Sequence, residues 1–119
     1  MSGPAYTQAK VAGRNFVRAN LRGARLVHLD LLGKSFRHAD AAGAVFTGSL
    51  LNGANFSHAD LRGADLRDTC LRGAKFTGAN LTGANFTSAD VTDATVAPTA
   101  TSRAIGWGSS PASSVCLPG

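Results

Sequence analysis

The sequence predicts an all-β solenoid whose coils have four sides. All six phenylalanines share one register of a five-residue repeat that runs from Ala9 to about Pro98. Eighteen consecutive units have a central residue, which is large and apolar in every unit except at Ala41. Alanine stands two positions before the centre in thirteen units, and glycine stands two positions after it in ten. These three regularities indicate that each unit turns the chain in the same way.

A period of five fits neither an α-helix nor a straight strand. It would wind the central residues around a helix, and it would point them to alternate faces of a strand. A corner in every unit keeps them all inward, with glycine or a short polar residue where the backbone is strained. Four sides are favoured over three because a spacing of twenty gives uniform columns, and eighteen units then form about four and a half coils. The predicted core ladder is Phe16, Phe36, Phe56, Phe76; Leu31, Leu51, Leu71; and, facing the phenylalanines, Leu26, Phe46, Leu66, Phe86.

Runs such as Ala79-Asn80-Leu81-Thr82-Gly83 resemble the pentapeptide-repeat family. The resemblance implies a right-handed, four-sided parallel β-helix with the central residue and the preceding alanine inward. It also implies action through protein contacts rather than through chemistry. Bulkier or polar residues replace the inward alanine at Arg14, Leu29, Lys34, Ser49 and Thr69, and we expect Arg14 and Lys34 to disturb the first coils.

Three segments are expected: an N-terminal arm over residues 1–8, the β-helix over 9–98 and an irregular tail over 99–119. The arm is too short to cap the solenoid, and the tail is too polar to form its own core. Trp107 is the preferred anchor of the tail, either on its own last coil or in a partner's pocket. Cys70 and Cys116 fit a reducing compartment and are expected to form no disulfide framework. No signal pattern or membrane span is recognised, so a cytoplasmic or particle-associated protein is expected.

Charge and apolar residues concentrate near the N-terminal end. Residues 1–38 carry a formal charge of +6, and the remaining residues sum to −1. An acidic protein partner, nucleic acid or simple solvation could each explain this excess. Outward apolar residues there are typical of a protein interface. The candidate interface consists of Val27, Leu32, Val45, Leu50, Arg22, Arg25, Arg37 and Trp107.

Signals for catalysis or metal binding are weak. His38 and His58 should stack one coil apart, but two ligands make a poor metal site. Gly33-Lys34-Ser35 imitates the end of a phosphate-binding loop without the required earlier glycine. The chain has no glutamate and offers no nucleophile with a base beside it. We therefore expect no catalytic, cofactor-binding or metal site, and no small-molecule substrate.

The predicted function is a non-enzymatic scaffold for protein interaction, an accessory or decorating subunit of a larger assembly such as a phage or other particle. A protein partner or a second copy of the chain is expected, and no membrane. Two alternatives stay open. Some relatives imitate DNA and protect type II topoisomerases from quinolones, which requires an acidic rod, whereas this chain is basic. The other alternative is direct nucleic-acid binding by the basic first coils.

Overall fold

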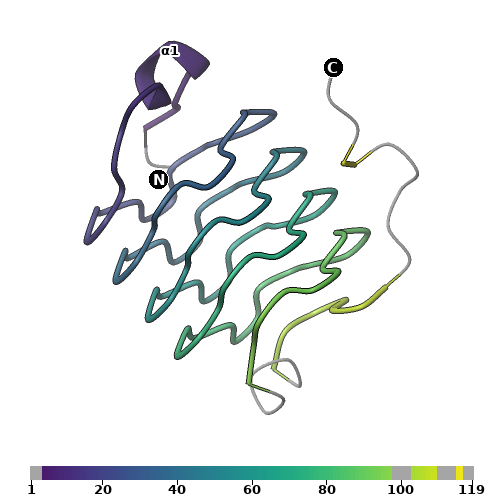
Figure 1. Ribbon diagram of the computed structural model, residues 1–119. Helices are drawn as coiled ribbons and strands as arrows, with labels where there is room; N and C mark the ends of the chain where they lie inside the picture. Colours follow the sequence, from purple (N-terminus) through teal and green to yellow (C-terminus); the bar gives the residue numbers. More distant parts are fainter. Residues whose placement is uncertain (1–3, 98–102, 110–114, 117–119) are drawn as a thin grey trace.

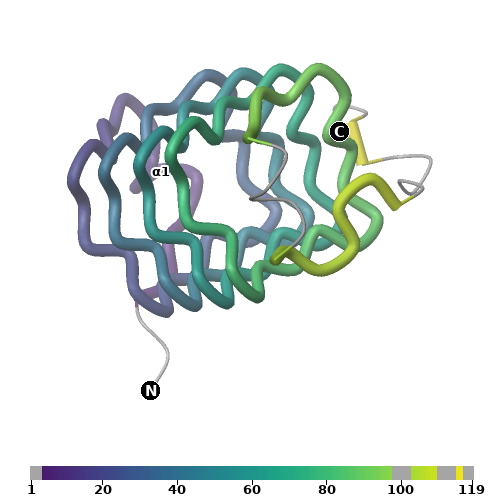
Figure 2. The backbone as a smooth tube through the Cα atoms, turned by 90° about the horizontal axis from the view of Figure 1, so that it is seen from below, coloured from purple at the N-terminus to yellow at the C-terminus, as the bar shows by residue number. Residues whose placement is uncertain are grey.

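Stacked coils of twenty residues form the body of the protein in the computed structural model (Figure 1). The structure describes residues 4–97, 103–109 and 115–116; residues 1–3 of the predicted arm and much of the predicted tail lie outside the described residues. Parallel bridges join residues twenty positions apart, from Ala5 with Arg25 to Asn85 with Ile105. Four five-residue units therefore separate neighbouring positions in the stack, as the residue columns predict. Viewed along the stack, the coils nearly superpose around one axis (Figure 2).

Regular secondary structure is sparse in the described residues. The helix α1, Gln8–Val11, lies near the N-terminus. In the described ranges the β-structure consists of isolated one-residue bridges, without an extended strand. The reason is the corner in each unit, which leaves one bridging residue between consecutive turns.

A tight turn with one left-handed residue makes each corner. In the unit around Leu21, the Ala24 N–H donates to the Leu21 carbonyl, and Gly23 has a φ of +63°. Glycine accepts this conformation without strain, which explains its place in the repeat. In the described residues, seven positions that are not glycine adopt the same positive φ: Arg18, His28, His38, His58, Asp68, Ser88 and Asp93.

The predicted ladder fills the core. The eleven phenylalanines and leucines of the three columns are each at most 1% exposed. Rings of the first column stack in parallel, with centroids 5.1 Å, 4.6 Å and 5.3 Å apart from Phe16 to Phe76. Phe46 meets two of these rings edge-on at 5.7 Å, so the two aromatic columns face each other as expected. Side chains thus occupy the axis of the solenoid.

The inward polar replacements are satisfied by hydrogen bonds. Ser49 Oγ donates to the Leu26 carbonyl and accepts from the Leu29 N–H, and Thr69 Oγ1 donates to the Leu66 carbonyl. These bonds let buried hydroxyls replace alanine without loss of regularity.

The N-terminal end is capped, so the prediction that residues 1–8 are too short to do this is wrong. Ala5 bridges Arg25, and the Tyr6 ring packs edge-on against Phe16 at 5.8 Å. The Gln8 side chain accepts from the Asp30 N–H at 2.8 Å and donates to the Asp30 carbonyl at 3.0 Å. One side-chain amide therefore replaces the backbone of a missing coil.

The side chains of Arg14 and Lys34 also form contacts that stabilise the N-terminal end. Lys34 Nζ donates to the carbonyls of Val11 and Arg14, and the Arg14 guanidinium lies 5.6 Å from the centre of the Tyr6 ring. In the described residues, Lys10 and Asn15 form no β-bridge to the residues twenty positions later, whereas their equivalents in the later coils do. The disturbance expected from Arg14 and Lys34 is therefore local to the first coil.

The C-terminal end is closed by residues 103–109, which return across the last coil. Ile105 bridges Asn85, and the Phe86 N–H donates to the Ile105 carbonyl at 2.7 Å. The half-buried Trp107 lies edge-on to Phe86 at 4.9 Å and to Phe76 at 5.8 Å. Trp107 thus continues the aromatic stack of its own solenoid.

Candidate functional site

The predicted apolar residues lie on adjoining parts of neighbouring coils. Arg25 bridges Val45, and Asp30 bridges Leu50. Val45 and Leu50 therefore lie on two adjacent sides of the solenoid, one coil after the sides that carry Val27 and Leu32. Leu32 is 52% exposed, and the other three are half-buried. We call Val27, Leu32, Val45 and Leu50 the apolar patch. Its exposed member is unusual in the described residues, where Val17 and Ile105 are the other exposed large apolar side chains.

The arginines predicted to flank this patch have different surroundings. Arg22 is engaged by Asp40, with its Nε 2.7 Å from Asp40 Oδ2. Arg25 is exposed and lies beside the patch through its bridge to Val45. Arg37 belongs to another side of the coil, because its carbonyl accepts from the Arg18 N–H. Of the predicted arginines, Arg25 is therefore the one that the fold brings to the apolar patch.

Arginine and aspartate pairs neutralise other parts of the surface. Arg62 lies 2.6 Å from Asp60, and Arg67 lies 2.8 Å from Asp65. The hydrogen bond from Arg62 is the main cause that lowers the pKa of Asp60. Burial acts to raise the pKa of Asp65, but hydrogen bonds from Arg67 outweigh it, and the pKa lies below its usual value. The arginine side chains are about half exposed, so each pair contributes little to stability.

His38 and His58 stack as predicted, with ring centroids 5.0 Å apart. The His58 ring also covers Gly78, where an added Cβ would meet it. Desolvation in the stack, and then Arg18, His58 and Arg37, lower the pKa of His38. Within residues 4–97, 103–109 and 115–116, no group of three or more histidine, cysteine or acidic side chains could hold a metal ion.

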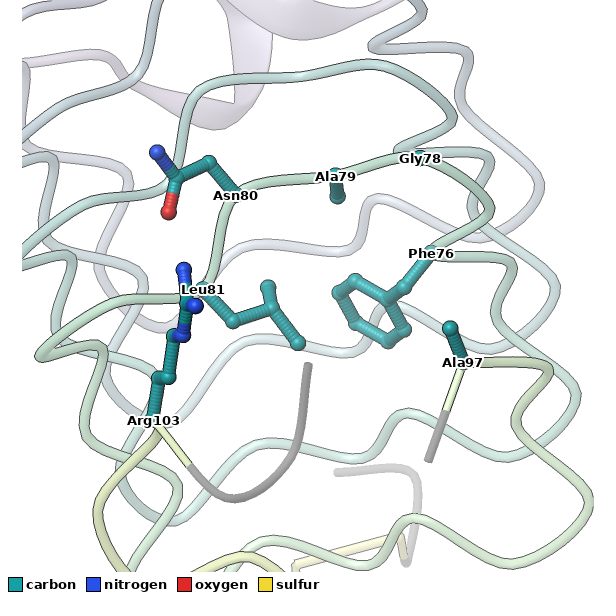
Figure 3. Close-up of a pocket in the computed structure, with 7 residues that line it drawn as sticks. All are labelled: Phe76, Gly78, Ala79, Asn80, Leu81, Ala97 and Arg103. Carbon is teal, nitrogen blue, oxygen red and sulfur yellow. The ribbon is translucent and has the colours of Figure 1, made fainter. Parts of the chain in front are cut away.

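A pocket of about 320 Å³ lies at the C-terminal end (Figure 3). Its floor is the end of the aromatic and leucine columns, and Arg103 supplies the charged group of its lining. An arginine without a nucleophile or base beside it can orient an anion but offers no acid–base chemistry at neutral pH. The lining residues are Phe76, Gly78, Ala79, Asn80, Leu81, Ala97 and Arg103.

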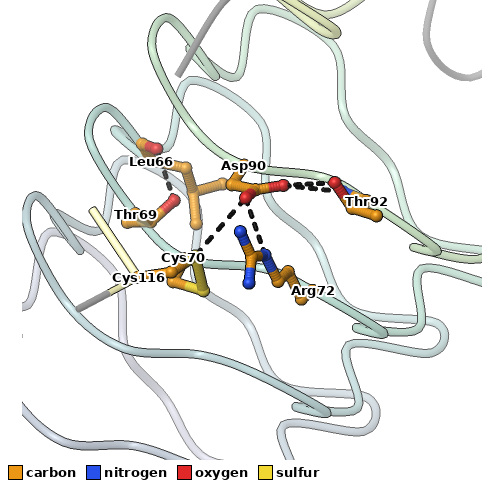
Figure 4. The surroundings of a disulfide bond; sticks show 7 residues. All are labelled: Leu66, Thr69, Cys70, Arg72, Asp90, Thr92 and Cys116. Atoms are coloured by element: carbon orange, nitrogen blue, oxygen red, sulfur yellow. Dashed lines mark hydrogen bonds and ion pairs between the residues drawn. A yellow bond between two sulfur atoms is a disulfide. The ribbon is translucent and has the colours of Figure 1, made fainter. Parts of the chain in front are cut away.

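Cys70 and Cys116 form a disulfide, so the expectation that they form no framework is wrong (Figure 4). Cys70 stands at an outward position, as predicted, but it is fully buried. The Cys116 sulfur lies 3.6 Å from Asp90 Oδ2, and Arg72 Nε lies 2.7 Å from the same oxygen. Sequence reasoning missed this contact because the two cysteines are 46 positions apart, which is not a multiple of the twenty-residue spacing of the stack. The disulfide removes the main argument for a reducing compartment.

The part of the chain that the structure describes contains no helix with the length and apolar character needed to cross a bilayer.

Comparisons with known proteins agree with this geometry. A pentapeptide-repeat protein of the Arabidopsis thaliana thylakoid lumen is 35% identical, with a TM-score of 0.54 over 82% of this chain and 63% of its own. Rfr23 of the cyanobacterium Cyanothece 51142 has a TM-score of 0.59 and 24% identity over 66% of this chain and 56% of its own, which shows the fold alone. The chain thus spans about three fifths of the length of these structures. No curated protein matches it.

The family assignment follows from the repeat and the match together. The profile of pentapeptide repeats (8 copies) matches residues 15–50, 35–68 and 69–96, which is most of the solenoid. Structures of this kind imply a right-handed β-helix, and such proteins are generally structural or interaction proteins rather than enzymes. The chain belongs to the pentapeptide-repeat family.

Proposed function

We propose that the protein is a rigid, four-sided scaffold of about four and a half coils that docks another protein on its apolar patch. In this proposal, residues 1–8 form an N-terminal arm or cap, 9–98 the β-helix and 99–119 an irregular C-terminal tail. The observation that carries the proposal is the exposed Leu32 beside Val27, Val45 and Leu50 on adjoining sides of neighbouring coils. A contiguous apolar patch at a surface is typical of a protein interface.

The remainder of the surface supports a docking function rather than a chemical one. The core columns are filled by side chains, and the described pocket has one charged group in its lining. Thr77, Thr82 and Thr87 occupy the outward position after the centre in the C-terminal coils, where Val27 and Leu32 stand near the N-terminal end. The large apolar residues at this position, Val17, Val27 and Leu32, thus all belong to the N-terminal coils. An accessory subunit of a larger assembly would use such a surface.

The charge of the chain disfavours the DNA-mimicking alternative. Imitation of DNA requires an acidic surface, whereas this chain has a formal net charge of +5. No feature of the described residues favours a topoisomerase as partner.

A site-specific photo-crosslinker tests the proposal. Placed at position 32 in the producing cells, it should capture one defined protein or a second copy of the chain. The same crosslinker at Thr82, which stands at the equivalent position of a later unit, should capture nothing comparable. Capture at 32 that persists unchanged when Leu50→Asp is added, or equal capture at both positions, would contradict the apolar patch as the docking surface. Gel filtration with light scattering on the purified chain separates self-association from binding to another protein.

A further inference from the structure

The excess positive charge of the chain lies on one side of the solenoid. Residues 14–18, 34–38, 54–58 and 74–78 stack on one another, as shown by hydrogen bonds from Arg18 to Arg37, from His38 to Ser57 and from His58 to Thr77. We call these four segments the basic side. They contain no aspartate, and the seven basic residues elsewhere equal the seven aspartates in number. The lysines and arginines of the basic side are Arg14, Arg18, Lys34, Arg37 and Lys75.

Four of the six arginines outside the basic side are paired with an aspartate, whereas in the described residues none on the basic side is. Arg22, Arg62, Arg67 and Arg72 each form an ion pair with an aspartate. Over the described ranges no such pair involves the basic side. Arg18, Arg37 and Lys75 are exposed there. Unpaired cations on one side of a rigid body produce a directed positive field, which net charge alone would not.

The corner of the basic side carries large residues where glycine would be least strained. Arg18, His38 and His58 have φ values of +60°, +59° and +61°. The next corner along the chain has glycine at the same position in four successive coils, from Gly23 to Gly83. Left-handed backbone at a non-glycine residue costs roughly 1 kcal/mol or more, a cost that His28, Asp68, Ser88 and Asp93 on the other sides also carry. The lowered pKa of His38, caused first by desolvation and then by Arg18, His58 and Arg37, agrees with a positive local field.

We propose that the basic side binds an acidic segment of a protein partner. The inference rests on the proposed scaffold function and assigns the chemistry of one partner. Val17, 39% exposed, supplies an apolar contact among these cations, as protein interfaces do. Asn15 and Asn55 accept local N–H groups through their side-chain oxygens, which leaves their amide nitrogens to donate to carboxylates.

Nucleic acid fits the same surface less well. Proteins that bind single strands stack bases on exposed aromatic rings. The rings of the basic side, Phe16, Phe36, Phe56 and Phe76, are at most 1% exposed and point into the core. Carboxylates need only the donors and cations that the surface presents.

Binding of a fluorescent 20-residue poly-glutamate to the full chain, followed by anisotropy in about 50 mM salt, tests the proposal. The variant Arg18→Gly with Arg37→Gln should bind about tenfold more weakly, because two exposed cations are lost. Glycine suits the positive φ of position 18, so this variant should stay folded. The matched control is Arg62→Gln with Arg67→Gln, which has the same net charge and should change affinity less than about threefold.

Three results would overturn the inference. These are the absence of poly-glutamate binding, an equal loss in the two double variants, and tighter binding of a 20-base-pair DNA duplex than of poly-glutamate at the same salt. The last result would assign the basic side to nucleic acid. Leu32→Asp should leave poly-glutamate binding intact, because Leu32 lies outside the basic side. If the chain does not bind poly-glutamate but the crosslinker at position 32 still captures a partner, this inference alone is removed. Loss of that crosslinking with poly-glutamate binding retained removes the apolar patch alone.

Discussion

At the N-terminal end the solenoid is closed by residues that immediately precede the repeat, whereas at the C-terminal end it is closed by a segment beyond the repeat that stacks on the last coil. The first closure uses the Gln8 amide on the backbone of Asp30 and the Tyr6 ring on Phe16. The second adds an aromatic residue, Trp107, and the covalent bond between Cys70 and Cys116. The difference teaches that contacts about one coil apart close both ends, whereas the C-terminal end adds a covalent link between residues 46 positions apart.

Loss of the disulfide should have the largest effect on this comparison. Replacing both cysteines by alanine removes a covalent link between two residues that are 46 positions apart in the sequence. In the chain-entropy view this costs about 2–4 kcal/mol of unfolding free energy. Thermal unfolding of the variant, beside the reduced wild-type protein, measures the loss. The C-terminal closure should loosen while exchange of the Asp30 amide stays slow. Detection of two free thiols in the untreated, denatured protein by alkylation and mass spectrometry would contradict the pairing.

Trp107→Ala should have the next largest effect. The ring meets Phe86 and Phe76 but is only half-buried, so we expect about 2–3 kcal/mol, below the cost of a fully buried aromatic residue. Urea unfolding measures it. Ile105→Ala is the control, because Ile105 is 52% exposed and its bridge to Asn85 uses the backbone. Equal losses in the two variants would show that the indole does not anchor this end.

The repeat, its core and Trp107 as an anchor of the tail could be predicted from the sequence, but the N-terminal closure and the disulfide could not. Column positions follow from spacing alone, since each unit repeats the same local turn, and the phenylalanines from Phe16 to Phe76 lie where the spacing of twenty predicts. Gln8 and Cys116 depend on single contacts outside that repetition, and no periodicity marks them. The apolar patch could be placed, but the neutralisation of Arg22 by Asp40 could not, because it depends on side-chain conformation between coils.

Acid should weaken the C-terminal end through Asp90. The Thr92 hydroxyl, with the Thr92 N–H and Arg72, holds the pKa of Asp90 below its usual value against desolvation. The ionised form therefore stabilises the fold above the unfolded pKa of about 4, and this contribution is lost as the pH falls through the lower folded pKa. Asp90→Asn should cost about 1–2 kcal/mol at pH 7, because charge-assisted hydrogen bonds are lost. Thermal unfolding midpoints of the two proteins should converge towards pH 3; a constant gap would contradict this role.

Gln8→Ala should have the smallest effect, and a local one. Two partly solvated hydrogen bonds to Asp30 are lost, which amounts to about 1 kcal/mol. Hydrogen exchange of the Asp30 amide should accelerate severalfold while the amides near Trp107 keep their rates. Gln8→Glu separates the two bonds, because a carboxylate still accepts from the Asp30 N–H but cannot donate to its carbonyl. Intermediate exchange at Asp30 in that variant would show that each half of the amide replaces one backbone group of the missing coil, whereas unchanged exchange in Gln8→Ala would show that other residues close this end.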